Sequence, residues 1–491
     1  MNQYWILVAI LLPMLSGIAL RFLPFKKKEH LYVFLETMMI ITSFVVWSLI
    51  LGGTTKVFHV VHFVNDLSIS FKIDGMTMVF AGLVSFLWPL ATLYAFEYME
   101  HHKRRETFFM FYSIAYGVTL GIAFASDMLT MYFFYELLTL STVPLVMHSL
   151  EREAVLATRK YLYYSLGGAA FAMMAMVFLM VYGDTLEFAL GGVLSPEKVA
   201  GHEGILLWIF LLAFLGFGVK AAIFPVCGWL PTAGVAPTPV TALLHAVAVV
   251  KAGVFALIRL TYYSFGADFL RGSWVQNVVM GLAMFTTVYG CSRALKESHI
   301  KRRLAYSTVS NLSYIIFGIT IMTPLGLVGA LCHLVCHAVM KICSFMCAGA
   351  FMHQTGKKYV FDMDGLGWKM PIVFCTLGFS GLGLMGVPGL AGFVSKWNLA
   401  AAAVDSKNPM AYVGIACLLI SALLTAIYMV SIAMRAFFPP VEWNKTEIKD
   451  AKDPGWKMCV PIIVCAICTL ALGLFSTPLV NFFRDVATGI Y

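Results

Sequence analysis

Apolar runs of about 20 residues recur along this chain, separated by short polar segments. A helix of ~20 residues, rising about 1.5 Å per residue, crosses the roughly 30 Å hydrocarbon core of a membrane. The pattern therefore predicts about fourteen membrane-spanning helices, with ends uncertain by ~2–4 residues. They are expected at 3–24, 31–52, 75–98, 107–125, 127–147, 158–182, 205–226, 240–263, 275–294, 304–322, 326–352, 371–404, 409–438 and 457–477.

The composition supports a membrane protein without a soluble domain. Hydrophobic residues make up 60% of the 491 residues, charged residues make up 12%, and the mean hydropathy is +0.85. Soluble domains hold only ~45–50% apolar residues, so the predicted fold class is an all-α integral membrane protein. The longest polar stretches, 183–204 and 439–456, are predicted loops without room for a flavin, nucleotide or iron–sulfur domain. The eleven cysteines lie mostly in apolar runs, which predicts packing residues.

Basic residues are distributed unequally between the two sides of the predicted membrane segment. The loops that follow odd-numbered spans hold 23 of the 34 Lys and Arg residues, and the loops on the other side hold seven. Positively charged loops lie mostly on the cytoplasmic side of a membrane. Both termini are therefore predicted on the outer side of the cell (inner) membrane. The net charge of +9 is explained by this asymmetry, and nucleic acid is not an expected partner. The basic run Lys26–Lys28 follows the first apolar segment, which argues against a cleaved signal peptide.

The span count suggests an internal repeat. Spans four to eight and nine to thirteen form two groups of five, and an odd number of spans inverts one group relative to the other, as in many transporters. The predicted regions are an N-terminal three-helix region at 1–106, a first inverted repeat at 107–263, a second at 264–438 and a C-terminal helix at 439–491.

Two of the predicted spans contain helix-breaking residues. Span seven runs into Pro225 and three further prolines, and span twelve contains Pro388-Gly389. Proline removes a backbone donor, and broken helices inside a membrane are tolerated where they line protein or a wet cavity. Spans seven and twelve are therefore predicted to be discontinuous. A simple kink or a helix end is the alternative.

Four lysines lie inside apolar segments: Lys220, Lys251, Lys341 and Lys396. A charged side chain at the bilayer centre costs at least ~3 kcal/mol, so these lysines are candidates for a functional site. Glu136 in the fifth span is the expected partner of Lys220, and movement of this partner would switch the lysine's proton on and off. The alternatives are a static ion pair, or a lysine that reaches up to the inner surface.

Histidines accompany the central lysines. His245 and Lys251 would lie ~9 Å apart along one helix, and His333, His337 and Lys341 are spaced i, i+4, i+8, which places them in one stripe ~12 Å long. A titratable stripe that ends in a lysine is typical of a proton path, although hydrogen-bonded packing histidines are an alternative.

These groups predict a proton path that runs from Glu136 and Lys220 through Lys251, His245 and the stripe to Lys396 near the outer side. Water would fill the gaps between the side chains. A haem or metal site at His333 and His337 is a weaker alternative, because the nearby lysines are poor ligands. No metal or cofactor is therefore expected.

Several segments resemble the antiporter-like proton-translocating subunits of respiratory complex I, membrane-bound hydrogenases and Mrp-type cation/proton antiporters. The resemblance is carried by Gly218–Pro231, Ala236–Ala246, Val250–Phe255, His337–Lys341 and Pro388–Lys396. It covers roughly residues 94–438 and is most specific from Lys220 to Lys251. The family's longest members continue into a lateral helix, so a chain stopping at Tyr491 resembles the shorter members, including the D-type Mrp subunit.

The resemblance implies roles for individual residues. Glu136 and Lys220 match the family's Glu–Lys pair, Lys251 matches the central lysine, and Lys396 matches the terminal lysine or glutamate of the broken twelfth helix. It also implies a fold of fourteen helices with two inverted five-helix repeats.

The expected function is proton translocation as one subunit of a multisubunit membrane complex, without a redox centre of its own. The expected partners are other integral membrane subunits, including further antiporter-like subunits, with protons or Na⁺ as the transported ion. Two alternatives remain open: a self-sufficient cation/proton antiporter, and a membrane anchor that binds a cofactor through His333 and His337.

Overall fold

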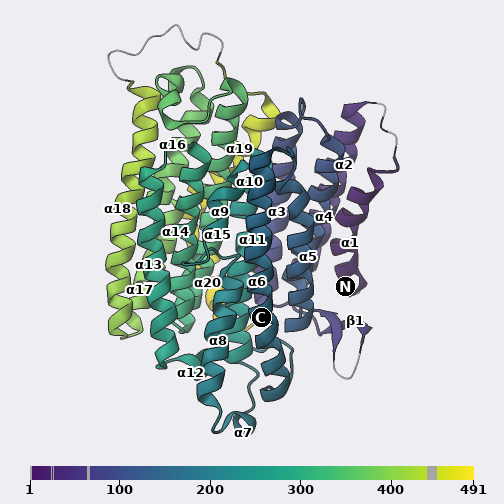
Figure 1. Ribbon diagram of the computed structural model, residues 1–491, viewed down its shortest axis with the longest axis vertical. Coiled ribbons are helices and arrows are strands. Elements are labelled where there is room, and N and C mark those ends of the chain that lie inside the picture. Colours follow the sequence, from purple (N-terminus) through teal and green to yellow (C-terminus); the bar gives the residue numbers. More distant parts are fainter. Residues whose placement is uncertain (1–2, 24, 26, 64–66, 440–450) are drawn as a thin grey trace.

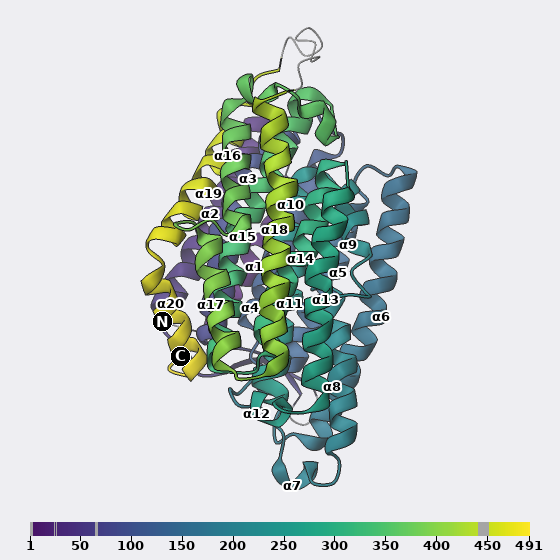
Figure 2. The same ribbon diagram turned by 90° about the vertical axis from the view of Figure 1, so that its left-hand side faces the viewer.

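The protein is a bundle of long helices that run along a common axis, as the computed structural model shows in Figures 1 and 2. The structure describes residues 3–23, 25, 27–63, 67–439 and 451–491. Lys26 of the predicted basic run and most of the predicted 439–456 loop lie outside these residues. Within them, one antiparallel two-stranded sheet joins β1 (Phe58–His62) to β2 (Ser68–Phe71) at the lower end of Figure 1.

The helices follow the predicted apolar runs closely. In chain order, those of ten or more residues are α1 (Tyr4–Ala19), α2 (Lys28–Leu51), α3 (Gly75–Tyr98), α4 (Arg105–Phe124), α5 (Met128–Val146), α6 (Arg152–Tyr182), α8 (Glu203–Gly218), α11 (Val249–Ile258), α13 (Trp274–Lys296), α14 (Ile300–Thr320), α15 (Pro324–Thr355), α16 (Pro371–Met385), α17 (Ala391–Asp405), α18 (Pro409–Phe437), α19 (Trp456–Leu474) and α20 (Ser476–Thr488). The shorter ones are α7 (Pro196–Val199), α9 (Trp229–Thr232), η1 (Ala233–Val235), α10 (Thr238–Ala246), the π-helix η2 (Arg259–Phe265), α12 (Ala267–Leu270), η3 (Val360–Met363) and η4 (Leu366–Trp368).

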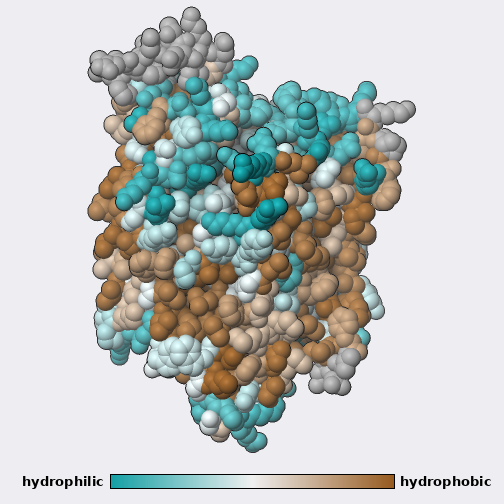
Figure 3. Space-filling model, viewed as in Figure 1, coloured by the Kyte–Doolittle hydropathy of each residue, from teal (hydrophilic) through white to brown (hydrophobic). Residues whose placement is uncertain are grey.

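The chain is a multi-pass membrane protein. Among the described residues, ten helical segments are long and apolar enough to cross a membrane, and α1, α8 and α16 are shorter apolar helices. Figure 3 shows a hydrophobic band between polar ends on the face that it draws, as expected for a protein surrounded by lipid. The start of α1 and the C-terminus lie toward the same end of the bundle (Figures 1 and 2).

Polar caps set the starts of several helices. The side chain of Asp74 accepts a hydrogen bond from the Thr77 backbone N–H, and that of Asp127 accepts one from Thr130, so these carboxylates satisfy backbone donors that the first turn leaves free. Proline in the first turn of α15, α16 and α18 costs no helical hydrogen bond. The apolar runs thus begin and end as helices for local reasons.

Both predicted helix breaks are present. α8 ends at Gly218, and the next helix, α9, begins at Trp229; α16 ends at Met385, and α17 begins at Ala391. The second break contains Pro388-Gly389, and Gly389 has a φ of +87°, a conformation that favours glycine. Proline and glycine therefore interrupt both helices as the sequence predicted.

A third break separates α10 from α11, and the sequence analysis did not predict it. The carbonyl of Leu243 accepts from the N–H groups of both Val247 (2.9 Å) and Ala248 (2.8 Å), which ends the regular helix. Neither proline nor glycine lies there, so the sequence carries no breaking signal. The expectation that His245 and Lys251 share one continuous helix is therefore wrong.

α15 lies in the centre of the molecule and carries the predicted stripe. It packs against α10, α14, α16, α17, α19 and α20. His333, His337 and Lys341 on this helix are all fully buried. The bundle therefore encloses these ionisable groups within protein.

Candidate functional site

Glu136 on α5 and Lys220, just beyond the end of α8, form an ion pair. The Lys220 Nζ lies 3.8 Å from the Glu136 Oε1, donates a hydrogen bond to the Tyr135 carbonyl, and lies 3.4 Å from the centroid of the Tyr135 ring. Lys220 is 1% exposed and Glu136 is 22% exposed. The first helix break thus turns Lys220 toward α5, and the predicted partner is in place.

Gly253 brings α11 against this break. A methyl group added at Gly253 would lie 2.4 Å from the Ala221 nitrogen and 2.7 Å from the Lys220 carbonyl carbon. Both distances are shorter than side-chain carbons adopt, so only glycine permits this approach. The helix that carries Lys251 is consequently held against the backbone that carries Lys220.

A row of groups continues from the buried Lys251 to Lys396, which is partly exposed. The Lys251 Nζ lies 2.9 Å from the His337 Nδ1, and the His337 and His333 rings stack with centroids 5.9 Å apart. The His333 ring stacks on Tyr314 at 5.0 Å, and the Lys396 Nζ lies 5.1 Å from the centroid of the same tyrosine ring. Four elements, α11, α15, α14 and α17, supply this row, which we call the lysine–histidine row.

Lys396 lies at the second helix break. Its Nζ donates to the carbonyls of Leu384 (2.8 Å) and Met385 (2.9 Å) at the end of α16. These carbonyls are among the last of the helix, which have no partner within it. Lys396 lies after the break, on α17, and its side chain caps the first half of the broken helix from the second half.

His245 and Lys341 form a branch beside the row. The His245 and Phe345 rings lie 4.8 Å apart, and the Lys341 Nζ lies 5.9 Å from the centroid of the same phenylalanine. Lys341 donates to the Ser307 hydroxyl at 2.7 Å. The predicted order, with His245 between Lys251 and the stripe, is wrong because Lys251 contacts His337 directly.

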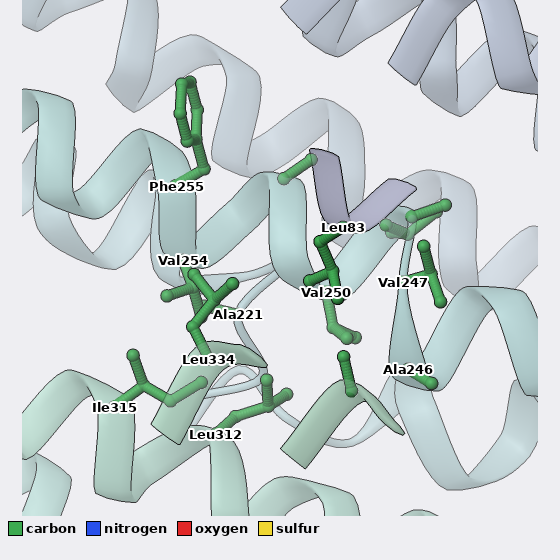
Figure 4. Close-up of a cluster of buried hydrophobic side chains, with 14 of the residues drawn as sticks. Leu83, Ala221, Ala246, Val247, Val250, Val254, Phe255, Leu312, Ile315 and Leu334 are labelled. Carbon is green, nitrogen blue, oxygen red and sulfur yellow. The ribbon is translucent and has the colours of Figure 1, made fainter. Parts of the chain in front are cut away.

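Apolar side chains surround the row. Figure 4 shows Ala221 from the first break and Val250 and Val254 from α11 packed with Leu334 and Ile315. These residues are fully buried. In such low-dielectric surroundings, the contact between Lys251 and His337 is stronger than it would be in water.

The donors around His333 and His337 do not form a metal site. His333 Nδ1 lies 2.9 Å from the Ser395 hydroxyl, and His337 Nδ1 faces Lys251. In the described part of the chain, no three His, Cys, Asp or Glu side chains gather with a geometry that could hold a metal ion. The two histidines are thus placed as hydrogen-bonding groups.

Comparison with known proteins identifies the family of this chain. Residues 125–435 match the family described as NADH:quinone oxidoreductase/Mrp antiporter, TM. The chain belongs to this NADH:quinone oxidoreductase/Mrp antiporter family. Residues 62–109 also match the N-terminus of chain 5 of NADH-ubiquinone oxidoreductase (complex I).

Two relatives show how much of this antiporter-family chain is shared. NADH-quinone oxidoreductase subunit N of Desulforudis audaxviator is 30% identical over 425 residues, covering 84% of this chain and 83% of that protein. Na(+)/H(+) antiporter subunit A1 of Staphylococcus haemolyticus is 26% identical and covers 98% of this chain. The chain spans only 62% of the length of that second relative.

Two solved structures share the fold of this antiporter-family chain. A chain of the Mrp complex from Dietzia superposes with a TM-score of 0.82 at 21% identity, covering 100% of this chain and 98% of that chain. A chain of an archaeal membrane-bound sulfane sulfur reductase superposes with a TM-score of 0.83 at 20% identity, covering 99% and 97%.

The structure of this antiporter-family chain adds ionisable residues that the sequence analysis missed. Lys301, counted as a loop residue, is 4% exposed and donates to the Ala236 carbonyl at 2.8 Å. Arg259, counted as an outer charge, is fully buried in η2. Glu36 lies in the spanning helix α2, and its Oε2 has no hydrogen-bond partner among the described residues. Arg259 and Glu36 both lie inside predicted spans. A charged residue inside an apolar run is the sequence signal that could have identified them.

Replacing Gly253 with alanine is expected to destabilise this antiporter-family chain by about 1–3 kcal/mol and to reduce ion transport. The added methyl group would push α11 away from the Lys220 backbone. Gly234→Ala is the matched control, because nothing lies within 4 Å of the added carbon there. Thermal unfolding of both variants in detergent and transport assays in vesicles would measure the effect. Equal unfolding midpoints would show that the close approach is unimportant.

Proposed function

We propose that this chain translocates protons across the membrane as one subunit of a multisubunit complex. The observation that carries the proposal is the lysine–histidine row, which reaches from Lys251 on α11 to Lys396 at the second helix break inside a closed apolar bundle. Buried ionisable groups are costly in a membrane, and a row of them is typical of a proton relay.

Each residue of the site takes a role in this proposal. At one end of the proton path, the Glu136 carboxylate stabilises the protonated form of Lys220. Loss of this ion pair releases the lysine's proton toward Lys251. Lys251 passes it to His337 across their 2.9 Å contact. His333 receives it by ring rotation or through water, and Lys396 is the terminal group.

His245 and Lys341 form a side branch in this proposal. They flank Phe345, and the buried Lys301 extends the branch toward the basic end of the bundle. The branch would supply protons from the cytoplasmic side to the row.

The finer architecture is also proposed here. It consists of fourteen spans, two inverted repeats at 107–263 and 264–438, and both termini on the outer side. Three observations support it. The two proline-containing breaks occur once in each proposed repeat. The chain ends lie at one end of the bundle, and the basic loops lie mainly at the other.

Other membrane subunits are the proposed partners. The solved structures that share this fold are chains of an Mrp complex and of a sulfane sulfur reductase complex. Glu136 is partly exposed on a bundle surface where α6 also presents apolar side chains, including Leu166, Phe171 and Val177. A neighbouring subunit would cover this carboxylate, and further antiporter-like subunits fit the role.

Sodium exchange is the second candidate function. A relative that covers 98% of this chain is named as a subunit of a Na(+)/H(+) antiporter. A carboxylate such as Glu136 can bind Na⁺ as well as hold a proton. In vesicles that contain the complex, proton uptake that does not depend on Na⁺ would support proton translocation, and uptake that requires Na⁺ would support exchange.

Replacing Glu136 with glutamine is expected to reduce proton translocation by the complex about tenfold or more, because the neutral amide cannot hold the Lys220 charge. Glu153→Gln is the control, since Glu153 is an exposed acidic residue in the first turn of α6. The measurement is quenching of a pH-sensitive dye in vesicles that carry the assembled complex. Full translocation by the Glu136→Gln complex would refute the assigned role.

A further inference from the structure

A pocket of about 300 Å³ lies between α17 and α20. One wall is formed by Phe393, Trp397 and Asn398 of α17, and the other includes Thr477, Asn481 and Arg484 of α20. One side of the pocket is therefore largely aromatic and the other is polar and basic. None of these residues belongs to the lysine–histidine row.

α20 is an amphipathic helix at one end of the bundle. Phe483, Val486 and Ala487 on one face are buried, whereas Asn481 and Arg484 on the other face are exposed. Figure 2 shows α20 beside α17, close to both ends of the chain. Amphipathic helices are typical of the membrane boundary, where the polar face meets lipid headgroups.

The polar wall offers hydrogen-bond donors to an anion. The Arg484 guanidinium and the Asn481 amide have no hydrogen bond or ion pair to any part of the chain that the structure describes. They are three residues apart, and Thr477 lies four residues before Asn481, so all three face one side of the helix. A guanidinium fork with amide and hydroxyl donors suits the oxygens of a phosphate group.

The aromatic wall suits the part of a lipid below its phosphate. The Phe393 and Trp397 rings stack with centroids 6.0 Å apart, and Trp397 is 65% exposed. Tryptophan is enriched at the boundary between headgroups and hydrocarbon, because its ring is apolar and its N–H is polar. A free phosphate would leave this aromatic wall uncovered, whereas a phospholipid would cover both walls.

We propose that the pocket between α17 and α20 binds an anionic phospholipid. Arg484, Asn481 and Thr477 contact the phosphate, and Phe393 and Trp397 pack against the glycerol and the upper acyl chain. This binding does not depend on the function proposed above, so the two can fail separately.

The bound lipid would stabilise the break that carries Lys396. A methyl group added at Gly473, near the end of α19, would lie 2.2 Å from the Gly389 carbonyl oxygen. The elbow between α19 and α20 is therefore packed directly on the break between α16 and α17. A lipid that bridges α17 and α20 would link the second half of the broken helix to the helix that follows this elbow.

Native mass spectrometry of the delipidated full-length chain in detergent tests the proposal. Phosphatidylglycerol is expected to bind about tenfold more tightly than phosphatidylcholine, and Arg484→Gln is expected to abolish this difference. Lys56→Gln is the matched control, since Lys56 is an exposed basic residue that does not line the pocket. Equal binding of both lipids, or an unchanged preference in Arg484→Gln, would overturn the proposal.

Two further arms separate the possible explanations. Inorganic phosphate that displaces phosphatidylglycerol at millimolar concentration would identify a phosphate site without lipid specificity and would overturn the assignment to a lipid. Arg484→Lys keeps the charge but loses the fork, so an affinity between those of the native chain and Arg484→Gln is expected. An unchanged unfolding midpoint of Arg484→Gln without lipid would confirm that the variant folds.

Discussion

Replacing Lys251 with methionine is expected to reduce proton translocation by roughly a hundredfold, the scale on which a positioned proton-transfer group acts. Lys251 is fully buried, and its Nζ is the group that contacts His337, at 2.9 Å. Methionine fills a similar volume without a titratable group, so the bundle should assemble while the row is interrupted. Dye quenching in vesicles that contain the complex measures the loss.

Lys251→Arg separates a proton-carrying role from a static one. Arginine keeps the positive charge but does not release its proton at physiological pH. If Lys251 only balances charge, the arginine variant should work; if it passes protons, this variant should be as inactive as Lys251→Met. Lys56→Met, at an exposed site, is the control for a lost lysine. Undiminished translocation by a correctly assembled Lys251→Met complex would falsify the proposed row.

Replacing Arg259 with methionine is expected to destabilise the protein by about 3–5 kcal/mol. The Arg259 Nη1 lies 2.7 Å from the Asp74 Oδ2, and the Nη2 lies 2.8 Å from the Asp74 Oδ1, in a two-bond arrangement that joins η2 to the start of α3. Removing the guanidinium leaves a mostly buried carboxylate whose one remaining cationic partner among the described residues is Lys72, 3.6 Å away. The unfolding midpoint in detergent should fall clearly.

A second substitution identifies the cause of this loss. Asp74→Asn removes the charge but keeps an oxygen that can accept from the Thr77 N–H. Adding it to Arg259→Met should recover part of the stability, because the buried group that lost its guanidinium partner is then neutral. No recovery would mean that the packing of Arg259 against Phe188, Phe255 and Tyr263 is the larger contribution.

The helices could be predicted from the sequence because a long apolar run in a membrane has few alternatives to a helix. Proline and glycine marked the breaks before Trp229 and at Gly389. The break between α10 and α11 could not be predicted, since Val247 and Ala248 carry no local signal. It arises from how the surrounding helices pack.

The members of the candidate site could be named from the sequence, but their order could not. A lysine inside an apolar run is conspicuous by itself, and the Glu136–Lys220 partnership was predicted correctly. Contacts between helices decide which groups are neighbours, and these place His337, rather than His245, beside Lys251. Lys301 was missed because its position next to Arg302 and Arg303 is typical of a surface loop.

The helix breaks also give the lysine–histidine row a direction. Because α11 begins at Val249, Lys251 lies in the first turn of a helix, where the backbone dipoles create a positive potential that opposes an ammonium charge. Lys396 instead contacts the last carbonyls of α16, where the potential is negative and favours such a charge. If the row carries protons as proposed, the backbone field favours the protonated state at Lys396 over that at Lys251.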